Sequence, residues 1–214
     1  MQSWTVRSVN CGKVAAFRDD EPSAIAKLVQ SGPVAVTRLG LAGDFQADRV
    51  HHGGPDMALH HYPRDHYCYW RGFVGDHPLL DGEGALGENI STLGLTEDQA
   101  CIGDRFRLGT AVVEISQGRK PCWKLGHRLD DPRVTAEVVR TGKAGWYYRV
   151  VEEGEVAAGD RLELIERPHP DWSVARVFDL IVAGGHKVDP AGLAALDGLD
   201  VLSADWRRRA AALG

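Results

Sequence analysis

The sequence predicts a mainly β fold with α-helical additions: a sandwich or barrel of short strands over residues 1–167, then a small three-helix C-terminal module over residues 170–214. Three observations support this prediction. The 25 glycines are scattered at turn positions and are not gathered in a linker. The stretches between them are short and rich in valine and aromatic residues. The two prolines of "RPHPDW" separate these stretches from three helical patterns.

The predicted strands follow one another along the first part of the chain. They lie in "GPVAVTRLGL", "DRFRLGTAVVEIS", "GWYYRVVEEG" and "GDRLELIER". Gly109-Thr110 is expected to turn the second stretch into a hairpin, and Gly159-Asp160 to lead into the last strand. Two helices are expected among the strands, one in "RDHYCYWRGFV" and one that starts at Asp131-Pro132 and ends at Gly142.

The C-terminal module carries three helix-start signals. Ser173, Asp189 and Ser203 are the predicted N-cap residues, and Pro190 stands at the first helical position after Asp189. Each helix is too short to persist alone in water, so the three must pack on one another or on the strands. The sequence leaves open whether the module docks on its own barrel or crosses to a second subunit of a homodimer.

Composition excludes several classes of protein. The formal net charge of −5 disfavours a general nucleic-acid binder, because neutralising phosphates requires a basic face. No apolar run approaches the ~18 residues of a membrane-spanning helix. The first residues, "MQSWTVRSVNCGKVAAF", lack the continuous apolar region of a secretory signal. We therefore expect a cytoplasmic protein without a membrane partner.

Cys122 is the most informative of the four cysteines. None of the four forms a C-x-x-C pair, which disfavours a zinc ribbon, a thioredoxin-like motif and an iron–sulfur cluster. In "ISQGRKPCWKLGHRL", Cys122 stands among the cations Arg119, Lys120, Lys124 and Arg128. Nearby cations lower the pKa of a thiol, and the thiolate attacks electrophiles or binds soft metals. The alternative is a buried cysteine that only packs.

A second stretch, "DFQADRVHHGGPDMALHHYPRDHY", is rich in histidine. It holds five of the 9 histidines, at positions 51, 52, 60, 61 and 66, and Gly53-Gly54 permits close approach of the backbone to a ligand. The spacing does not place two imidazoles on one helical face, as the zinc motif H-E-x-x-H does. As a set the histidines indicate a binding wall, whereas any single one is compatible with a core or surface role.

Two shorter stretches carry weaker signals. In "GALGENIST", Glu88-Asn89 stands where a strand should begin, and it either forms a local turn or faces a polar ligand. In "EPSAIAKLVQSGPV", Ser23 and Lys27 are four residues apart and would share one face of a helix. There they would form either a phosphate clamp or an N-cap with a solvated lysine.

Taken in order, these motifs resemble one family over nearly the whole chain. The stretches "LGLAGDFQADRVHHGGPDMALHHYPRDHYCYW", "LGENI", "IGDRFRLG", "SQGRKPCWKL" and "TGKAGWYYRVVEEGEVAAGDRLEL" resemble the MOSC domain, named for the C-terminal domain of molybdenum cofactor sulfurases. Within this family, the chain resembles the bacterial YiiM-like branch, in which a C-terminal three-helix module follows the MOSC domain. It implies a β-barrel-like MOSC domain that binds the molybdenum cofactor (molybdopterin).

The resemblance also implies an activity and a set of site residues. The activity is a molybdenum-dependent oxidoreductase that reduces N-hydroxylated compounds of the hydroxylaminopurine type, a detoxification reaction; pyridoxal phosphate binding is a further expectation at the level of the domain. Cys122, the cysteine of the "PC" motif, is the expected metal ligand, and Cys122, His52 and His60 are the expected catalytic residues. The expected cofactor-binding residues are Ser23, Lys27, His51, Gly53, Gly54, Tyr62, Asn89, Arg119, Lys124 and Arg149.

Two positions depart from the family pattern. Met57 follows Gly-Gly-Pro-Asp where the family has a lysine, which removes an expected contact near His60. Lys120 stands before Pro121, within the stretch that reads "PRQPC" in the family, and it keeps this loop basic.

The sequence also bears on partners and rival functions. It has no cysteine cluster, and its one G-x-G-x-x-G spacing, Gly82 to Gly87, leads into a predicted strand and not from a strand into a helix as a nucleotide-binding motif does, so a separate flavin-type reductase is expected to supply electrons. One rival is a molybdenum cofactor carrier or sulfur-transfer protein without reductase activity. Another is a cysteine hydrolase or transferase with Cys122 as nucleophile. A third is a DNA- or partner-binding tail through "DWRRRA", although three consecutive arginines point to different sides of a helix and favour a solvated face.

Overall fold

The structure, a computed structural model, describes residues 2–18, 21–47 and 53–214. The strands are β1 (Ser3–Thr5), β2 (Ser8–Gly12), β3 (Ala15–Arg18), β4 (Glu21–Ser23), β5 (Lys27–Val29), β6 (Val34–Thr37), β7 (Gly40–Leu41), β8 (Leu59–Pro63), β9 (Ile90–Thr92), β10 (Arg105–Leu108), β11 (Ala111–Gly118), β12 (Trp146–Glu152), β13 (Gly154–Val156) and β14 (Arg161–Glu166). The α-helices are α1 (Tyr67–Val74), α2 (Trp123–Arg128), α3 (Val134–Thr141), α4 (Val174–Phe178), α5 (Pro190–Ala195) and α6 (Ala204–Ala211).

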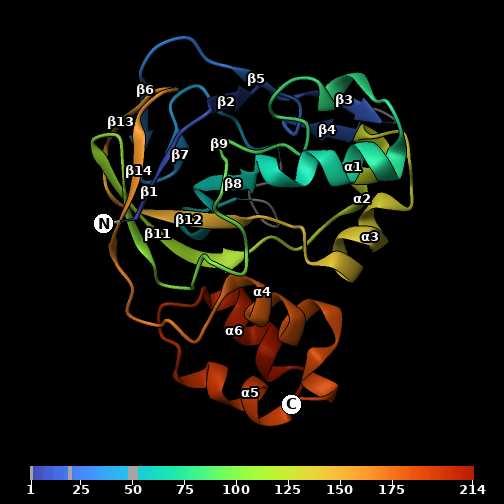
Figure 1. Cartoon of the computed structure of the whole chain (residues 1–214), viewed down its shortest axis with the longest axis vertical. Helices are drawn as coiled ribbons and strands as arrows, with labels where there is room; N and C mark the ends of the chain where they lie inside the picture. Colours follow the sequence, from blue (N-terminus) through green and yellow to red (C-terminus); the bar gives the residue numbers. More distant parts are fainter. Residues whose placement is uncertain (1, 19–20, 48–52) are drawn as a thin grey trace.

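A nine-stranded sheet that curls into a half-barrel dominates the molecule (Figure 1). The strand order is β1-β14-β10-β11-β12-β8-β9-β2-β5, and every neighbouring pair is antiparallel except β8 and β9. A parallel pair requires a long crossover, which α1 and the loop after it supply. The predicted mainly β, barrel-like fold with helices is confirmed as a mixed fold built on this half-barrel.

The β8–β9 pairing sets up the site described below. His61 lies opposite Ile90, so the backbone around His60 runs beside the backbone that follows Gly87. Asn89 N donates to His60 O at 2.8 Å. Two stretches that are about 30 residues apart in sequence therefore meet at one point of the sheet.

The predicted hairpins and interior helices are present. Gly109-Thr110 connects β10 to β11, with Leu108 opposite Ala111, and Gly159-Asp160 precedes β14. Helix α1 lies within the stretch in which a helix was expected, and Gly142, whose φ of 68° is left-handed, caps the C-terminus of α3.

The three predicted N-caps of the C-terminal module are confirmed. Ser173, Asp189 and Ser203 each accept a hydrogen bond from the backbone N–H three residues later, at 3.2, 2.7 and 3.2 Å. After α4 the chain continues as a π-helical turn, Asp179–Ala183, which the sequence did not predict. None of the helices in the described ranges is both long and apolar enough to span a bilayer.

The C-terminal module packs on the half-barrel of the same chain, next to β11 (Figure 1). Val174 N donates to Ala100 O at 2.8 Å, and Ser203 N donates to Ser116 O at 2.9 Å. The buried Trp206 ring lies over Gly118, where a Cβ atom would stand only 2.7 Å from it. The absence of a side chain at Gly118 thus makes room for the module.

The stretch with Ser23 and Lys27 is not helical, which corrects the prediction of a shared helical face. Ser23 ends β4, and Lys27 begins β5, which pairs with β2 through Gly12 opposite Lys27. Helix-compatible spacing is a weak signal, and the open edge of β2 supplies hydrogen bonds that a short isolated helix could not match.

Candidate functional site

The loop that carries Cys122 is held by backbone and side-chain contacts. Strand β11 ends at Gly118, and the next residue, Arg119, donates its N–H to Gly145 O at 3.1 Å. Cys122 then takes an extended conformation just before α2. Its carbonyl accepts hydrogen bonds from Leu125 N at 3.2 Å and from Thr135 Oγ1 at 3.1 Å. The half-buried thiol is therefore presented from a well-anchored backbone.

Cys122 lines a cavity of about 110 Å³, which we call the Cys122 cavity. Its described lining residues are Ser23, Ala24, Ile25, Lys27, Asp44, Phe45, Gln46, Ala47, Met57, His60, Gly87, Asn89, Arg119, Lys120, Cys122, Lys124 and Tyr147. Seven of the residues predicted from the sequence to form the site meet here. They are Ser23, Lys27, His60, Asn89, Arg119, Cys122 and Lys124.

The charges on the described part of this wall are mainly positive. The cationic lining residues are Lys27, Arg119, Lys120 and Lys124, whereas Asp44 is the carboxylate among those described. Arg119 and Lys124 are buried, with 7% and 8% of their surfaces exposed. Burial of positive charge is unfavourable unless an anion compensates it. Asp44 pairs with Lys27 and Glu21 pairs with Lys124, so Arg119 and Lys120 are the described cations on this wall that most favour an anionic ligand.

Asp44 organises one side of the cavity. Its two carboxylate oxygens lie 2.5 and 2.7 Å from Lys27 Nζ, and both side chains are buried. Oδ1 also accepts from Gly12 N at 2.6 Å, and Oδ2 accepts from Asn89 Nδ2 at 2.9 Å. Lys27 and Asn89 are thus held in place by one carboxylate, which also neutralises the lysine.

His60 faces the cavity in its neutral form. Burial lowers the pKa of His60 well below its usual range, and the positive charge of Arg119 lowers it further. Its backbone N–H donates to Asn89 Oδ1 at 3.0 Å, and Nε2 lies 3.5 Å from Ala144 O. A neutral imidazole can hydrogen-bond a ligand, but it is a poor proton donor at neutral pH.

Arg119 and Lys124 approach from the loop around Cys122. Burial raises the pKa of Tyr147 and outweighs the positive charge of Arg119, which acts to lower it, so this hydroxyl keeps its proton. Lys124 Nζ lies 3.2 Å from Glu21 Oε1 and donates to Pro22 O at 3.3 Å, which links α2 to β4.

Glu88 does not face the Cys122 cavity; it secures the loop before Asn89. It is fully buried and accepts hydrogen bonds from Gly84 N at 2.9 Å, from Leu86 N at 3.0 Å and from the Tyr67 hydroxyl. Of the two readings of Glu88-Asn89, a local turn therefore fits Glu88, whereas Asn89 lines the cavity. Burial raises the pKa of Glu88.

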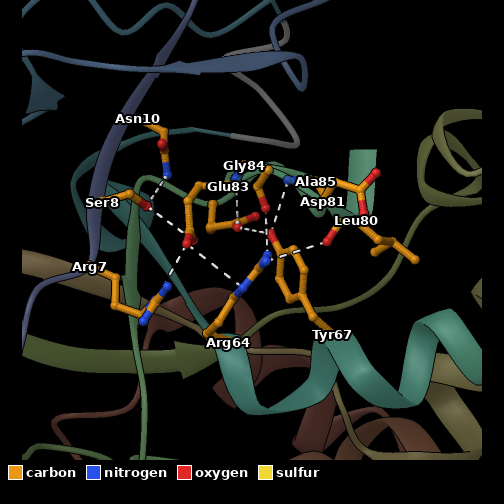
Figure 2. Close-up of polar contacts among 12 residues, drawn as sticks. Arg7, Ser8, Asn10, Arg64, Tyr67, Leu80, Asp81, Glu83, Gly84 and Ala85 are labelled. Carbon is orange, nitrogen blue, oxygen red and sulfur yellow. Dashed lines mark hydrogen bonds and ion pairs between the residues drawn. The ribbon is translucent and has the colours of Figure 1, made fainter. Parts of the chain in front are cut away.

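Figure 2 shows how this loop is joined to its surroundings. Arg7 and Arg64 approach Glu83 from two sides, with Arg7 Nε 3.3 Å and Arg64 Nε 3.7 Å from its carboxylate. The ring of Tyr67 lies under the guanidinium of Arg64, 3.8 Å from its carbon, and its hydroxyl accepts from Ala85 N at 3.1 Å. The network is structural: it ties the loop to β2 and α1.

Four predicted cofactor-binding residues are not among the residues that line the Cys122 cavity. Gly53 and Gly54 line a different pocket, beside α6. Tyr62 is buried in the core, where its hydroxyl donates to Lys143 O at 3.0 Å. Arg149 forms ion pairs of 2.8 Å with Asp56 and with Glu114. Among the remaining predicted residues, His51 and His52 lie outside the described residues.

The cavity also contains charged and aromatic residues that the sequence did not indicate. Asp44, Phe45 and Tyr147 line the cavity, yet none was singled out. A signal existed for Asp44 and Phe45, since they open the histidine-rich stretch directly after a glycine turn. Tyr147 lies within a predicted strand, and the side of the sheet that it faces depends on the register. Met57, the departure from the family pattern, also lines the cavity.

A curled half-barrel with a thiol on a cationic cavity is the arrangement expected of a MOSC domain. Residues 48–163 match the pattern of the family described as MOSC domain, and the chain belongs to this family. The protein YiiM of Escherichia coli is 46% identical over 159 residues, which cover 74% of this chain and 71% of that protein. These findings confirm the resemblance to the YiiM-like branch.

Two further similarities support this assignment. The crystal structure of YiiM from Geobacillus stearothermophilus matches with a TM-score of 0.80 and 33% identity, covering 97% of both chains. A protein of Gibberella moniliformis named Reductase is 41% identical over 172 residues, which cover 80% of this chain but 30% of that protein.

Proposed function

We propose that this protein is a molybdenum cofactor-dependent reductase of N-hydroxylated compounds. One observation carries the proposal: the thiol of Cys122 opens on a cavity whose described wall holds four cationic side chains and one carboxylate. MOSC domains form a molybdenum cofactor-associated family, and one relative is named Reductase. The substrates are proposed to be hydroxylaminopurine-type bases.

The residues present fit the cofactor. A dithiolene-bound molybdenum is a soft metal centre, for which a thiolate such as that of Cys122 is a suitable protein ligand. The cofactor carries a phosphate, to which the buried Arg119 is suited; Lys124 lies on the same wall, where Glu21 already pairs with it. When bound, the cofactor would supply the two-electron redox chemistry that side chains lack.

The chain's own residues would bind and orient the ligands. His60 and Asn89 would form hydrogen bonds with polar edges of the bound ligand. The protonated hydroxyl of Tyr147 would donate a hydrogen bond to an acceptor atom of that ligand. Breaking the N–O bond consumes two electrons and two protons and yields an amine and water. The lowered pKa of His60 favours a hydrogen-bonding role over that of proton donor.

We further infer that the electrons come from a separate flavin-type reductase. In the relative named Reductase, the region similar to this chain makes up 30% of the protein. Most of that protein therefore has no counterpart here, which fits a division of the reaction between two components in the present case.

The test is a measurement of molybdenum in protein made in a host with intact cofactor synthesis. Cys122→Ala is expected to lose most of the metal while it keeps its circular dichroism spectrum, because its sulfur is the proposed ligand. Cys68→Ala is the matched control, since Cys68 is exposed on α1 and does not line the cavity; it is expected to keep the metal.

Two outcomes would speak against the proposal. Equal molybdenum content in wild type and Cys122→Ala would remove Cys122 as the ligand. Metal-loaded protein that reduces no hydroxylamine with a chemical reductant would favour the alternative, a cofactor carrier or sulfur-transfer protein.

A further inference from the structure

A buried carboxylate outside the Cys122 cavity binds the backbone beside it. Glu97 lies in the connection between β9 and β10, with 4% of its surface exposed, and it is not among the described residues that line the cavity. Its Oε1 accepts from Gly145 N at 2.7 Å, and its Oε2 lies 2.7 Å from Nε2 of His66. Burial of a carboxylate is costly unless hydrogen bonds satisfy it, so these two partners fix the position of its oxygens.

Gly145 stands between two residues of the cavity wall. It directly precedes β12, the strand between β8 and β11. On one side its carbonyl accepts from Arg119 N at 3.1 Å. On the other side, a Cβ atom on Gly145 would lie 2.9 Å from Nε2 of His60, and its φ of 71° is in the region that favours glycine. The carbonyl oxygen of the preceding Ala144 lies 3.5 Å from the same ring nitrogen. This backbone therefore contacts both the start of the Cys122 loop and the imidazole that faces the cavity.

Glu97 also joins the C-terminal module to this segment. Its own carbonyl accepts from Ala175 N, in α4, at 3.0 Å. Tyr62 holds the same segment from the core, because its hydroxyl donates to Lys143 O at 3.0 Å. A hydrogen bond to a carboxylate is roughly twice as strong as one between neutral groups. The bond from Gly145 to Glu97 is therefore the stronger of these two restraints on the segment before β12.

We propose that Glu97 is a positioning residue of the Cys122 cavity, which fixes Arg119 and His60 relative to each other by holding the backbone of Gly145. A displacement of Gly145 would move both residues, since its carbonyl binds one and its α-carbon packs against the other. This role rests on the proposed function only in that Arg119 and His60 are the groups that would bind the cofactor or substrate. Displacements of about 1 Å far from the reacting atoms can disable such a site.

The test is amide hydrogen exchange, measured by NMR on the full chain purified from a host with intact cofactor synthesis. Glu97→Met removes both oxygens at similar size. The Gly145 amide is then expected to exchange about 10- to 150-fold faster, the effect of losing a hydrogen bond to a charged group, and the Arg119 amide should become faster with it. Glu97→Gln keeps one neutral acceptor, so its rates should lie between those of wild type and Glu97→Met. Arg119 is the diagnostic amide, because its bond is to Gly145.

Glu114→Met is the matched control. Glu114 is as buried as Glu97, with 4% of its surface exposed. Its two oxygens bind Arg105 and Arg149, neither of which is among the described residues of the cavity wall. Its loss should lower the stability of the chain and leave exchange at the Arg119 amide as in wild type.

The outcomes that overturn the proposal are defined. They are wild-type exchange at Arg119 in Glu97→Met, or the same acceleration in Glu114→Met. If Glu97→Met does not fold, Glu97→Gln decides, and unchanged exchange at both amides overturns the proposal. Molybdenum content is the second readout: Glu97→Met should hold less than Glu114→Met, and equal content overturns the proposal. Wild type without molybdenum would instead count against the reductase function, and the exchange rates would still test the role of Glu97.

Discussion

Three histidines close together in sequence occupy three different environments. His60 faces the Cys122 cavity. His61 points into the core, where it stacks on Trp146 at 4.3 Å and hydrogen-bonds the hydroxyls of Tyr148 and Thr92 at 3.0 and 2.9 Å. His66 is buried, with Nε2 2.7 Å from Glu97 Oε2. Of these three histidines, His60 alone lines the candidate site, whereas His61 and His66 make contacts within the core.

His61 should make the fold sensitive to acid. Burial lowers its pKa from 6.5 to about 3, so between these values the unfolded chain binds a proton that the folded chain rejects. Stability is then highest above pH 6.5 and falls by about 1.4 kcal/mol per pH unit as the pH drops toward 3. His61→Gln removes this titration, and its urea-unfolding free energy is expected to fall less steeply from pH 6 to pH 4.

The comparison at pH 8 supplies the control for this prediction. There His61 is neutral in both the folded and the unfolded chain, so the difference between wild type and His61→Gln measures the changed packing and hydrogen bonds to Tyr148 and Thr92, without a contribution from titration. Parallel pH profiles for the two proteins would contradict the assignment of the acid sensitivity to His61.

At the scale of single elements, the β10–β11 hairpin delivers the site loop. Gly109 has a φ of +59°, as the first central residue of a type II′ turn requires. A Cβ atom at this position would lie 2.3 Å from Glu155 O. Thr110 N donates to the same carbonyl at 3.0 Å, which ties the turn to β13. The turn sets the register of β11, whose end leads directly to Arg119 and Cys122.

Two glycine substitutions should therefore change the free energy of unfolding in opposite directions. Gly109→Ala is expected to destabilise the protein by about 1–3 kcal/mol, because its conformation and its neighbours both exclude a side chain. Gly72→Ala, on the exposed face of α1 with open space around it, is expected to stabilise by about 0.5–1 kcal/mol. Chemical denaturation of both variants tests this, and a stabilised Gly109→Ala would contradict the turn geometry.

At the scale of the whole molecule, the C-terminal module is coupled to the half-barrel. Trp206 is buried against Gly118, one residue before Arg119. Helix α6 also lines a pocket of about 260 Å³ with Gly53 and Gly54. The module thus reaches both segments that border the cavity, the loop of Cys122 and the segment that leads to Met57.

Trp206→Ala should lower the stability of the entire chain. Removing a buried tryptophan costs about 3–5 kcal/mol, and the hydrogen bonds between module and barrel make a single cooperative transition the expected result. Calorimetry should show one shifted peak. Leu213→Ala, at a partly exposed position of the same module, should change stability by less than about 1 kcal/mol. A separate transition of the module, with the barrel unaffected, would contradict this coupling.

Local chemistry made much of the fold predictable from sequence. The caps at Ser173, Asp189 and Ser203 and the turn at Gly109-Thr110 depend on hydrogen bonds and dihedral angles within a few residues. The ordered motifs identified the family, and the cations around Cys122 indicated a thiol with a function.

Which residues line the cavity, by contrast, depends on which strands become neighbours in the sheet. Asp44 reaches Lys27 and Asn89 only because β2 pairs with β5 and with β9, and β8 runs parallel to β9. The four-residue spacing of Ser23 and Lys27 was compatible with a helix. The segment forms strands instead because it pairs with the edge of β2, and spacing along the chain carries no information about that partner. Local rules act over three or four residues, whereas the electrostatics of the site arise from residues up to about a hundred positions apart, which only the folded chain brings together.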